Sequence, residues 1–229
     1  MKGTSVMQDV GQVGELIASR RNGASRLVVG IAGPPASGKS TFAEALVSHL
    51  NQDERPGSQR AALLPMDGYH LDNGLLRSRR LLARKGAPET FDSQGFCNAV
   101  FGVHDARTEM FFPSFDRERD IAIANSISIG PDIDVIVVEG NYLLLTSDPW
   151  VRMKELFALT VFLSPGLEVL RQRLQARWTD HGLDPQAALE RVSQNDLPNA
   201  ELVLRQSGPA DVVLEQTWSR AGAVAPQNP

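Results

Sequence analysis

A run of small residues has the composition of a phosphate-binding loop. It follows the pattern G-x-x-x-x-G-K-[ST] and consists of Gly33, Pro34, Pro35, Ala36, Ser37, Gly38, Lys39 and Ser40. Glycines let a backbone wrap closely around a phosphate, so that its N–H groups donate to the oxygens. We expect this loop and the adjoining Thr41 to bind the phosphates of a nucleoside triphosphate, with Lys39 as a catalytic charge and Ser40 as a Mg²⁺ ligand. The alternative is a glycine-rich turn without a ligand.

Two acidic residues each follow a short apolar run, where a strand of a parallel sheet would end. Asp67 comes after 61–65, and Glu139 comes after 135–138. Ligand crevices open at this end of α/β sheets, and phosphoryl transfer to a hydroxyl uses a carboxylate that accepts the hydroxyl proton. We therefore expect Asp67 to be the catalytic base and Glu139 to help bind Mg²⁺. The competing interpretations are an ordinary turn aspartate and an exposed glutamate at a strand end.

Charged and aromatic residues between these two acids are candidates for binding the acceptor. They are His70, Arg84, Lys85, Glu89, Phe115 and Arg117. Basic side chains gather anionic ligands, and loop segments can close over a small molecule. We expect these residues to form the acceptor site together with Asp67. A solvated helix face for the basic residues, and a surface turn around Phe115, are the simpler alternatives.

Arginines at helical spacing predict a lid in the C-terminal part of the chain. Arg173 and Arg177 share one helix face because they are four residues apart. An arginine that a closing lid brings in neutralises the oxygens of the transferred phosphoryl group and helps to exclude water. We expect a lid around residues 171–190 in which both arginines are catalytic. The alternative is a surface helix rich in arginine.

The elements that must position these residues alternate along the chain. Short apolar runs predict strands at 27–32, 61–65, 135–138, 159–163 and 212–214. Helical stretches separate these runs, an order typical of a parallel sheet covered by helices on both faces. Residues 110–112 and 121–129 predict a small peripheral hairpin.

Length and composition limit the class of protein. With 229 residues we expect one domain, residues 1–217, followed by a flexible tail at 218–229. The formal net charge of −4 argues against a nucleic-acid partner. No apolar run reaches the roughly 18 residues of a membrane span. The single cysteine, Cys97, fits a reducing cytoplasm, so a cytoplasmic location is expected.

The same motifs, in the same order, resemble a family of small-molecule kinases. The resemblance rests on residues 33–40, 66–73, 84–92, 138–142 and 195–199. The chain is similar to the phosphoribulokinase, uridine kinase and bacterial pantothenate kinase group, and within it to proteins labelled fructose transport system kinases. The match extends over most of the chain, far beyond the phosphate-binding loop.

The resemblance implies a P-loop NTPase three-layer α/β sandwich with a parallel five-stranded sheet, helices on both faces and a small lid. It also implies ATP, Mg²⁺ and transfer to a primary hydroxyl. By position, Asp67 matches the family's base and Glu139 its second acidic residue near the metal, while Arg173 and Arg177 fall in the lid segment. Arg117 falls where relatives place polar side chains on the acceptor. Related kinases often form dimers, so a homodimer is one expectation.

The sequence leaves the acceptor open. We expect a sugar or sugar-like polyol, because the fructose label points there and the tyrosine and histidine arrangement that grips a pyrimidine in uridine kinases is not visible. A nucleoside and a pantothenate-like acid are the alternatives within the kinases. From another class, a P-loop ATPase switch would hydrolyse ATP without a metabolite acceptor. The expected base and lid arginines favour the kinase.

Overall fold

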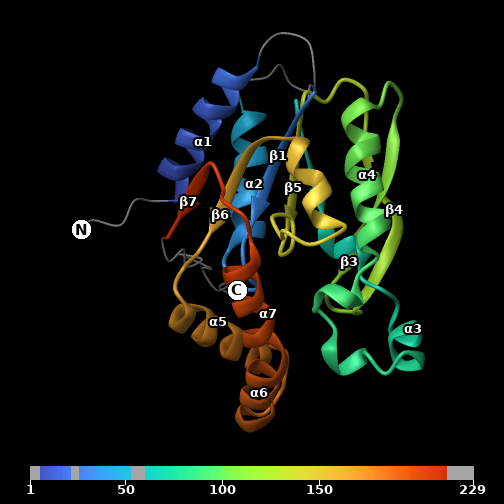
Figure 1. Ribbon diagram of the computed structural model, residues 1–229, viewed down its shortest axis with the longest axis vertical. Coiled ribbons are helices and arrows are strands. Elements are labelled where there is room, and N and C mark those ends of the chain that lie inside the picture. Colours follow the sequence, from blue (N-terminus) through green and yellow to red (C-terminus); the bar gives the residue numbers. More distant parts are fainter. Residues whose placement is uncertain (1–5, 22–25, 53–59, 216–229) are drawn as a thin grey trace, which may run out of the picture.

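Strands and helices alternate along the described part of the chain, residues 6–21, 26–52 and 60–215 of a computed structural model (Figure 1). The main sheet contains β1 (Leu27–Ala32), β2 (Ala61–Pro65), β5 (Val135–Gly140), β6 (Phe157–Leu163) and β7 (Val212–Leu214). The helices are α1 (Val6–Arg20), α2 (Lys39–Leu50), α3 (Asn73–Ser78), α4 (Ser93–Asp105), α5 (Leu167–Asp180), α6 (Pro185–Arg191) and α7 (Leu197–Gln206). A separate hairpin joins β3 (Met110–Asp116) and β4 (Ile121–Ile129). The tail expected at 218–229 lies outside the described residues.

The main sheet is parallel throughout, in the order β2-β5-β1-β6-β7 among the described residues. β1 lies at its centre, paired with β5 from Leu27 opposite Val135 to Ala32 opposite Gly140. Because all five strands point the same way, their carboxyl ends meet at one edge of the sheet. The segments that follow β1, β2 and β5 therefore come together, and the predicted fold class is confirmed.

Alternate residues of the central strands face opposite layers of helices. Val29 and Ile31 pack with α1 and α2 in one apolar cluster. Val28 and Ala32 belong to a second cluster, which contains α4 and the short 3₁₀ turn Trp150–Glu155. All four of these strand residues are fully buried. The β-period of the sequence thus produces the three layers, with the sheet in the middle.

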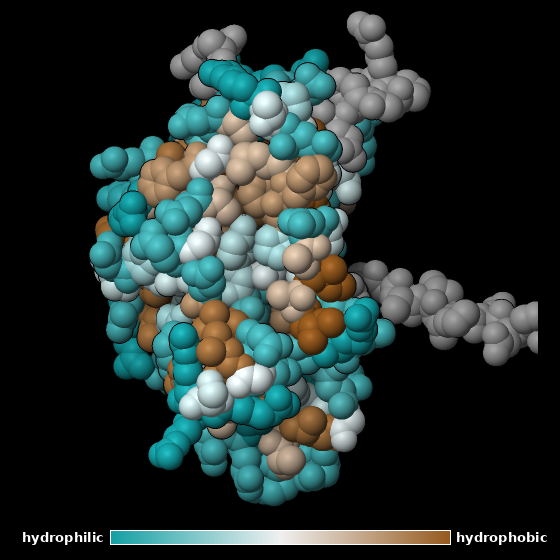
Figure 2. Space-filling view, turned by 90° about the vertical axis from the view of Figure 1, so that its right-hand side faces the viewer, coloured by the Kyte–Doolittle hydropathy of each residue, from teal (hydrophilic) through white to brown (hydrophobic). Residues whose placement is uncertain are grey.

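The β3–β4 hairpin lies outside α4, on the opposite side of the molecule from α1 (Figure 1). Phe112 and Ile129 face inward and join the α4 cluster, whereas Phe111 is exposed. Figure 2 shows the face on this side of the molecule, which is mostly hydrophilic with scattered apolar areas. The predicted hairpin is therefore present, and β3 extends beyond the expected 110–112 to Asp116.

Helices α5, α6 and α7 project beyond the carboxyl edge of the sheet (Figure 1). A π-helical turn, Val192–Asp196, joins α6 to α7. Leu174, Val192 and Leu197 form a small buried cluster of their own, against which Ala36 of the phosphate-binding loop packs. This unit is where the lid was expected. Every helix in the described residues is too short or too polar to cross a membrane.

Candidate active site

The phosphate-binding loop connects β1 directly to α2. Gly38 precedes the first residue of α2 and has a φ of +95°, a left-handed conformation that glycine adopts at little cost. The free N–H groups at the start of α2 and its positive dipole end therefore border the cavity described below. The helix begins at Lys39, because the end of the loop already forms its first turn.

Lys39 and Glu139 form a buried ion pair beneath the loop. Their Nζ and Oε1 atoms are 3.6 Å apart, and the side chains are 11% and 4% exposed. Burial raises the pKa of Glu139 above its usual value, and the charge of Lys39 opposes this rise. The carboxylate also forms a side-chain hydrogen bond with Ser40. The strand end of β5 thus places an acidic group directly behind the phosphate-binding loop.

The groups around Glu139 suit a magnesium ion that is bound mainly through substrate phosphates. Mg²⁺ usually takes one or two protein oxygens and fills its other positions with phosphate and water. Here the donors are the Ser40 hydroxyl and the Glu139 carboxylate, and the buried Asn141 Oδ1 has no hydrogen-bond partner. Asn141 borders the cavity. The described residues contain no cluster of three or more acidic, histidine or cysteine ligands, which such a site does not need.

Asp67 follows β2 and is held by an arginine from the hairpin. Arg117 Nη2 donates to Asp67 Oδ2 at 2.8 Å, and the Asp67 side chain is 24% exposed. Burial raises the pKa of Asp67, but the basic side chains of His70, Arg117, Lys39 and Arg177 outweigh it and hold the pKa below its usual value. At neutral pH the group is therefore an ionised carboxylate that can accept a proton.

The hairpin reaches Asp67 because the neighbouring residue has no side chain. A Cβ atom on Gly68 would lie 2.2 Å from the Pro113 carbonyl oxygen, so only glycine permits this approach. β3 then continues past Pro113 to the turn that carries Arg117. Gly68 thus explains how a peripheral hairpin contributes to the site.

Aromatic rings pack against one another beside Asp67. The His70 ring centroid lies 4.0 Å from that of Phe91 and 4.6 Å from that of Phe115. Lys85 Nζ lies 5.0 Å from the Phe115 centroid. Burial lowers the pKa of His70, and its Nδ1 lies 2.8 Å from the Asp67 carbonyl oxygen. His70 is therefore a packed ring whose burial disfavours its charged form.

The two predicted lid arginines make different contacts. Arg173 Nη1 donates to the carbonyl oxygens of Ala36 and Ser37, each at 3.2 Å, and so braces the phosphate-binding loop. The Arg177 Cζ atom lies over the Trp178 ring, 5.6 Å from the ring centroid. The buried Nε atom of Arg177 has no hydrogen-bond partner among the described residues. Burial lowers the pKa of Arg177. Arg177 also lines the cavity, where a guanidinium is suited to an anionic ligand.

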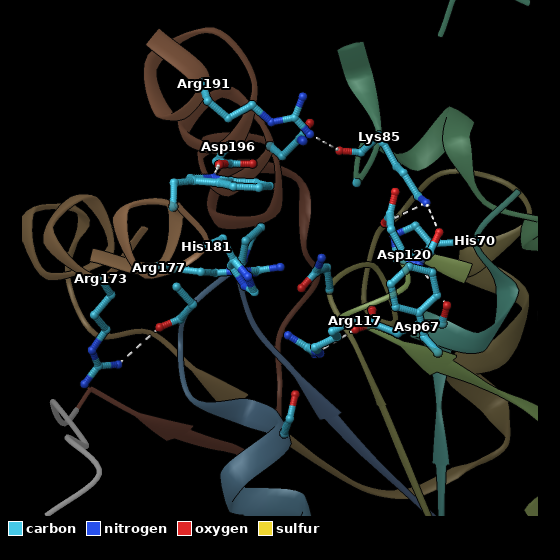
Figure 3. A pocket seen from close by; sticks show the side chains of 18 of the residues that line it. Asp67, His70, Lys85, Arg117, Asp120, Arg173, Arg177, His181, Arg191 and Asp196 are labelled. Atoms are coloured by element: carbon cyan, nitrogen blue, oxygen red, sulfur yellow. Dashed lines mark hydrogen bonds and ion pairs between the residues drawn. The ribbon is translucent and has the colours of Figure 1, made fainter. Parts of the chain in front are cut away.

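These groups surround one cavity of about 1300 Å³. The phosphate wall consists of Pro35, Ala36, Gly38, Lys39, Ser40 and Thr41. The acceptor wall consists of Asp67, His70, Asn73, Lys85, Phe115, Arg117 and Asp120. The lid wall consists of Arg173, Arg177, Trp178, His181 and Arg191. Figure 3 shows the lid side chains on one side of this cavity and the acceptor side chains on the other.

Some predicted residues do not line the cavity. Gly33, Pro34 and Ser37 belong to the phosphate-binding loop but do not border the cavity. Glu139 is buried beneath the loop. Arg84 and Glu89, expected on the acceptor, pair with each other at 3.6 Å between Nε and Oε1. Arg84 also donates to Asn195 Oδ1 at 2.9 Å. The structure thus places Arg84 and Glu89 outside the cavity, in a link to the π-helical turn Val192–Asp196.

Several cavity residues escaped the sequence analysis. Trp178 donates a hydrogen bond through Nε1 to Oδ2 of the buried Asp196. The Arg191 Cζ atom lies 5.0 Å from the centroid of the Trp178 ring. Asn141 comes two residues after Glu139 and directly follows the last residue of β5. Its position after a strand was the signal that could have revealed it. Asp120 belongs to the hairpin turn, whose contacts no local pattern reveals. Their roles depend on tertiary contacts between segments far apart in the chain.

The P-loop between β1 and α2, Asp67 after β2 and the cavity that both border are features of the class of small-molecule P-loop kinases. The comparison with known families agrees, since the model "Phosphoribulokinase / Uridine kinase family" matches residues 28–221. The chain belongs to the phosphoribulokinase / uridine kinase family. The enzyme is accordingly a nucleotide-binding kinase for a small metabolite, and its family implies the use of ATP.

Individual relatives cover most of the chain. The Schizosaccharomyces pombe protein named "Putative uridine kinase C227.14" is 33% identical over 83% of this chain and 83% of its own length. A Silicibacter sp. TM1040 protein, described as a "putative fructose transport system kinase", is 38% identical with a TM-score of 0.82, covering 92% of this chain and 99% of that one. The pantothenate kinase of Mycobacteroides abscessus is 30% identical over 63% of this chain and 46% of its own length.

Proposed function

We propose that this kinase transfers the γ-phosphate of ATP to a hydroxyl of a sugar or sugar-like polyol, with Asp67 as the base. The observation that carries the proposal is the position of Asp67, at the end of β2 on the wall facing the lid, with its carboxylate oriented by Arg117. An ionised carboxylate there accepts the proton of the acceptor hydroxyl as its oxygen attacks the phosphorus.

The other walls supply charge for the transfer. Lys39 and the start of α2 bind the phosphates, and Arg177 adds a guanidinium from the lid. Magnesium held near Ser40 and Glu139 would shield the charge of the phosphates. Arg173 acts on the loop backbone, through the Ala36 and Ser37 carbonyl oxygens. The lid, residues 171–190, excludes water so that the acceptor is the favoured nucleophile.

The acceptor wall supports a polyol better than a flat base. The His70 ring already packs against Phe91 and Phe115, which leaves little aromatic surface on which a nucleobase could stack. The remaining groups are charged or amide side chains that hydrogen-bond to hydroxyls. The label of the Silicibacter relative points the same way. A nucleoside and a pantothenate-like acid are the alternative acceptors.

The experiment is a screen for ADP release from ATP and Mg²⁺ with hexoses, pentoses, uridine, cytidine and pantothenate. Mass spectrometry of each mixture identifies any phosphorylated product. We expect one class of sugar to accelerate ADP release and to appear as a monophosphate. A phosphorylated nucleoside or pantothenate would replace the polyol assignment, and ADP release that ignores every acceptor would contradict the acceptor site itself.

A further inference from the structure

Lys85 lies on the acceptor wall, but its ammonium group is fully occupied by the protein. Its Nζ atom is 2.7 Å from Asn73 Oδ1, 2.8 Å from Asp120 Oδ1 and 3.0 Å from the Asp120 carbonyl oxygen. A lysine ammonium has three N–H donors, and these contacts use them. The side chain is only 9% exposed. Lys85 therefore has no donor left for an acceptor hydroxyl, contrary to the expectation from the sequence.

The backbone of Lys85 is held from the lid side. Asn195 Nδ2 donates to the Lys85 carbonyl oxygen at 3.0 Å, and Arg191 Nη2 donates to the same oxygen at 3.3 Å. Arg191 Nη1 also donates to the Ala83 carbonyl oxygen at 3.0 Å. The main chain at Lys85 is thus anchored on the lid unit, while its ammonium reaches across to the hairpin and α3. The close view in Figure 3 shows this reach from Lys85 to Asp120.

The hairpin turn that Lys85 contacts also carries the partner of Asp67. Asp120 closes this turn with a φ of +55°, and Arg117 lies three residues before it. The Arg117 side chain is 50% exposed, so packing alone does not fix its position. Its contact with Asp67 Oδ2 at 2.8 Å therefore depends on a fixed turn. Asn73 strengthens the turn by donating to Asp120 Oδ2 at 2.7 Å.

We propose that Lys85 is a positioning residue for the base: it fixes the β3–β4 turn through Asp120 and Asn73, so that Arg117 orients Asp67. Arg117 occupies one carboxylate oxygen and leaves the other for the acceptor hydroxyl. Lys85 acts through the turn and does not touch the acceptor. The inference rests on the proposed function, because it assigns a role relative to Asp67 as base.

The test compares Lys85→Met, which keeps the aliphatic stem, with Lys85→Arg, which keeps the charge. Lys154→Met is the matched control, because Lys154 is exposed on the far 3₁₀ turn Trp150–Glu155. Hydrogen exchange of the amides at 117–121 is measured on the protein without an acceptor. We expect exchange about tenfold faster in Lys85→Met, a partial return in Lys85→Arg and no change in Lys154→Met.

Kinetics with ATP and an acceptor found in the screen separate positioning from binding. We expect Lys85→Met to lower kcat about tenfold, with acceptor KM changed less than about twofold, because the base is misplaced while acceptor contacts stay. Lys85→Met and Arg117→Met should not be additive, since both remove the same orientation of Asp67. Asp120→Asn is a second variant that acts on the same contact, and asparagine tolerates its left-handed conformation. It should shift exchange in the same direction.

A higher acceptor KM with unchanged kcat in Lys85→Met would overturn the inference and make Lys85 an acceptor ligand. Unchanged exchange at 117–121 in both Lys85→Met and Asp120→Asn would overturn it as well. If no acceptor is phosphorylated in the screen, the proposed function fails. The exchange measurement then decides the role of Lys85 by itself.

Discussion

The phosphate wall of the cavity comes from one continuous segment, whereas the acceptor wall is assembled from segments far apart in the chain. Backbone conformation fixes the first, through the left-handed Gly38 and the start of α2. Side-chain pairs fix the second, including Lys85 with Asp120 and Arg117 with Asp67. A backbone-built site binds the group that all substrates share. A wall built from pairs can change its ligand by changing a few side chains, which suits a family with different acceptors.

The largest effect should come from the phosphate wall. Lys39→Ala removes the charge that acts on the phosphates and leaves the buried Glu139 without its partner. We expect turnover to fall about a thousandfold and nucleotide binding to weaken as well. Calorimetric titration with ATP and steady-state kinetics measure the two effects. Wild-type values for both would contradict the role of this wall, and Lys154→Ala serves as the control.

The lid arginines should separate transfer from nucleotide binding. Arg177→Met removes a guanidinium that lines the cavity, so kcat should fall about a hundredfold. Arg173→Met loosens the loop that binds ATP, so it should mainly raise the KM for ATP, about tenfold. Arg171→Met is the control on the same helix, since Arg171 pairs with Glu168 on the helix surface, at 3.6 Å between Nε and Oε2. Equal effects of the first two variants on kcat and KM would remove the distinction.

A stability measurement tests how the hairpin joins the acceptor wall. Gly68→Ala would place a Cβ atom 2.2 Å from the Pro113 carbonyl oxygen, so we expect a loss of about 2 kcal/mol in the free energy of unfolding. Gly11→Ala in α1 is the control, because nothing lies within 4 Å of its added Cβ. Alanine favours a helix, so Gly11→Ala should be neutral or stabilising. Denaturant unfolding of both variants checks the difference, and equal stabilities would refute the close approach.

The smallest effect should be a pH dependence confined to the acceptor wall. Burial raises the pKa of Asp120, but hydrogen bonds from Lys85 and Asn73 outweigh it and hold the pKa below its usual value. The contact therefore stabilises the turn above the unfolded pKa and is lost as the pH falls through the folded pKa. Because Asp120 is half exposed, the effect is small.

Hydrogen exchange, corrected for intrinsic rates, should show the turn at 117–121 losing protection in acid, while the hydrogen-bonded amides of α2 from Phe42 onward, next to the phosphate wall, keep theirs. Asp120→Asn should abolish the difference between the two walls. Equal loss of protection in both walls would mean that the whole molecule, and not this contact, responds to acid.

The sequence predicted the main sheet well because each strand is a short apolar run bounded by turns. The expected strands at 27–32, 61–65 and 212–214 match β1, β2 and β7, and β5 and β6 are slightly longer than expected. The hairpin was also predicted. The predicted strand at 110–112 was shorter than β3, because the residues from Pro113 to Asp116 do not continue the apolar run.

The candidate site was predictable only where residues are contiguous or follow a strand. The segment 33–41, Asp67 and Glu139 could be located by these rules. The bond between Lys85 and Asp120 joins residues 35 positions apart, and no local spacing encodes it. Arg84 was expected on the acceptor because it belongs to a basic stretch, yet it donates a hydrogen bond to Asn195 in the π-helical turn Val192–Asp196. Tertiary packing, which decides such contacts, is not visible in periodicity.

The role of Asp67 is the central claim, and Asp67→Asn tests it most directly. The variant keeps the shape of the side chain and removes the group that accepts the proton. With ATP, Mg²⁺ and the acceptor found in the screen, we expect kcat to fall by a factor of about 10² to 10⁴, while the affinity for ATP changes less than about threefold. Wild-type turnover in Asp67→Asn would show that another group accepts the proton and would contradict the account.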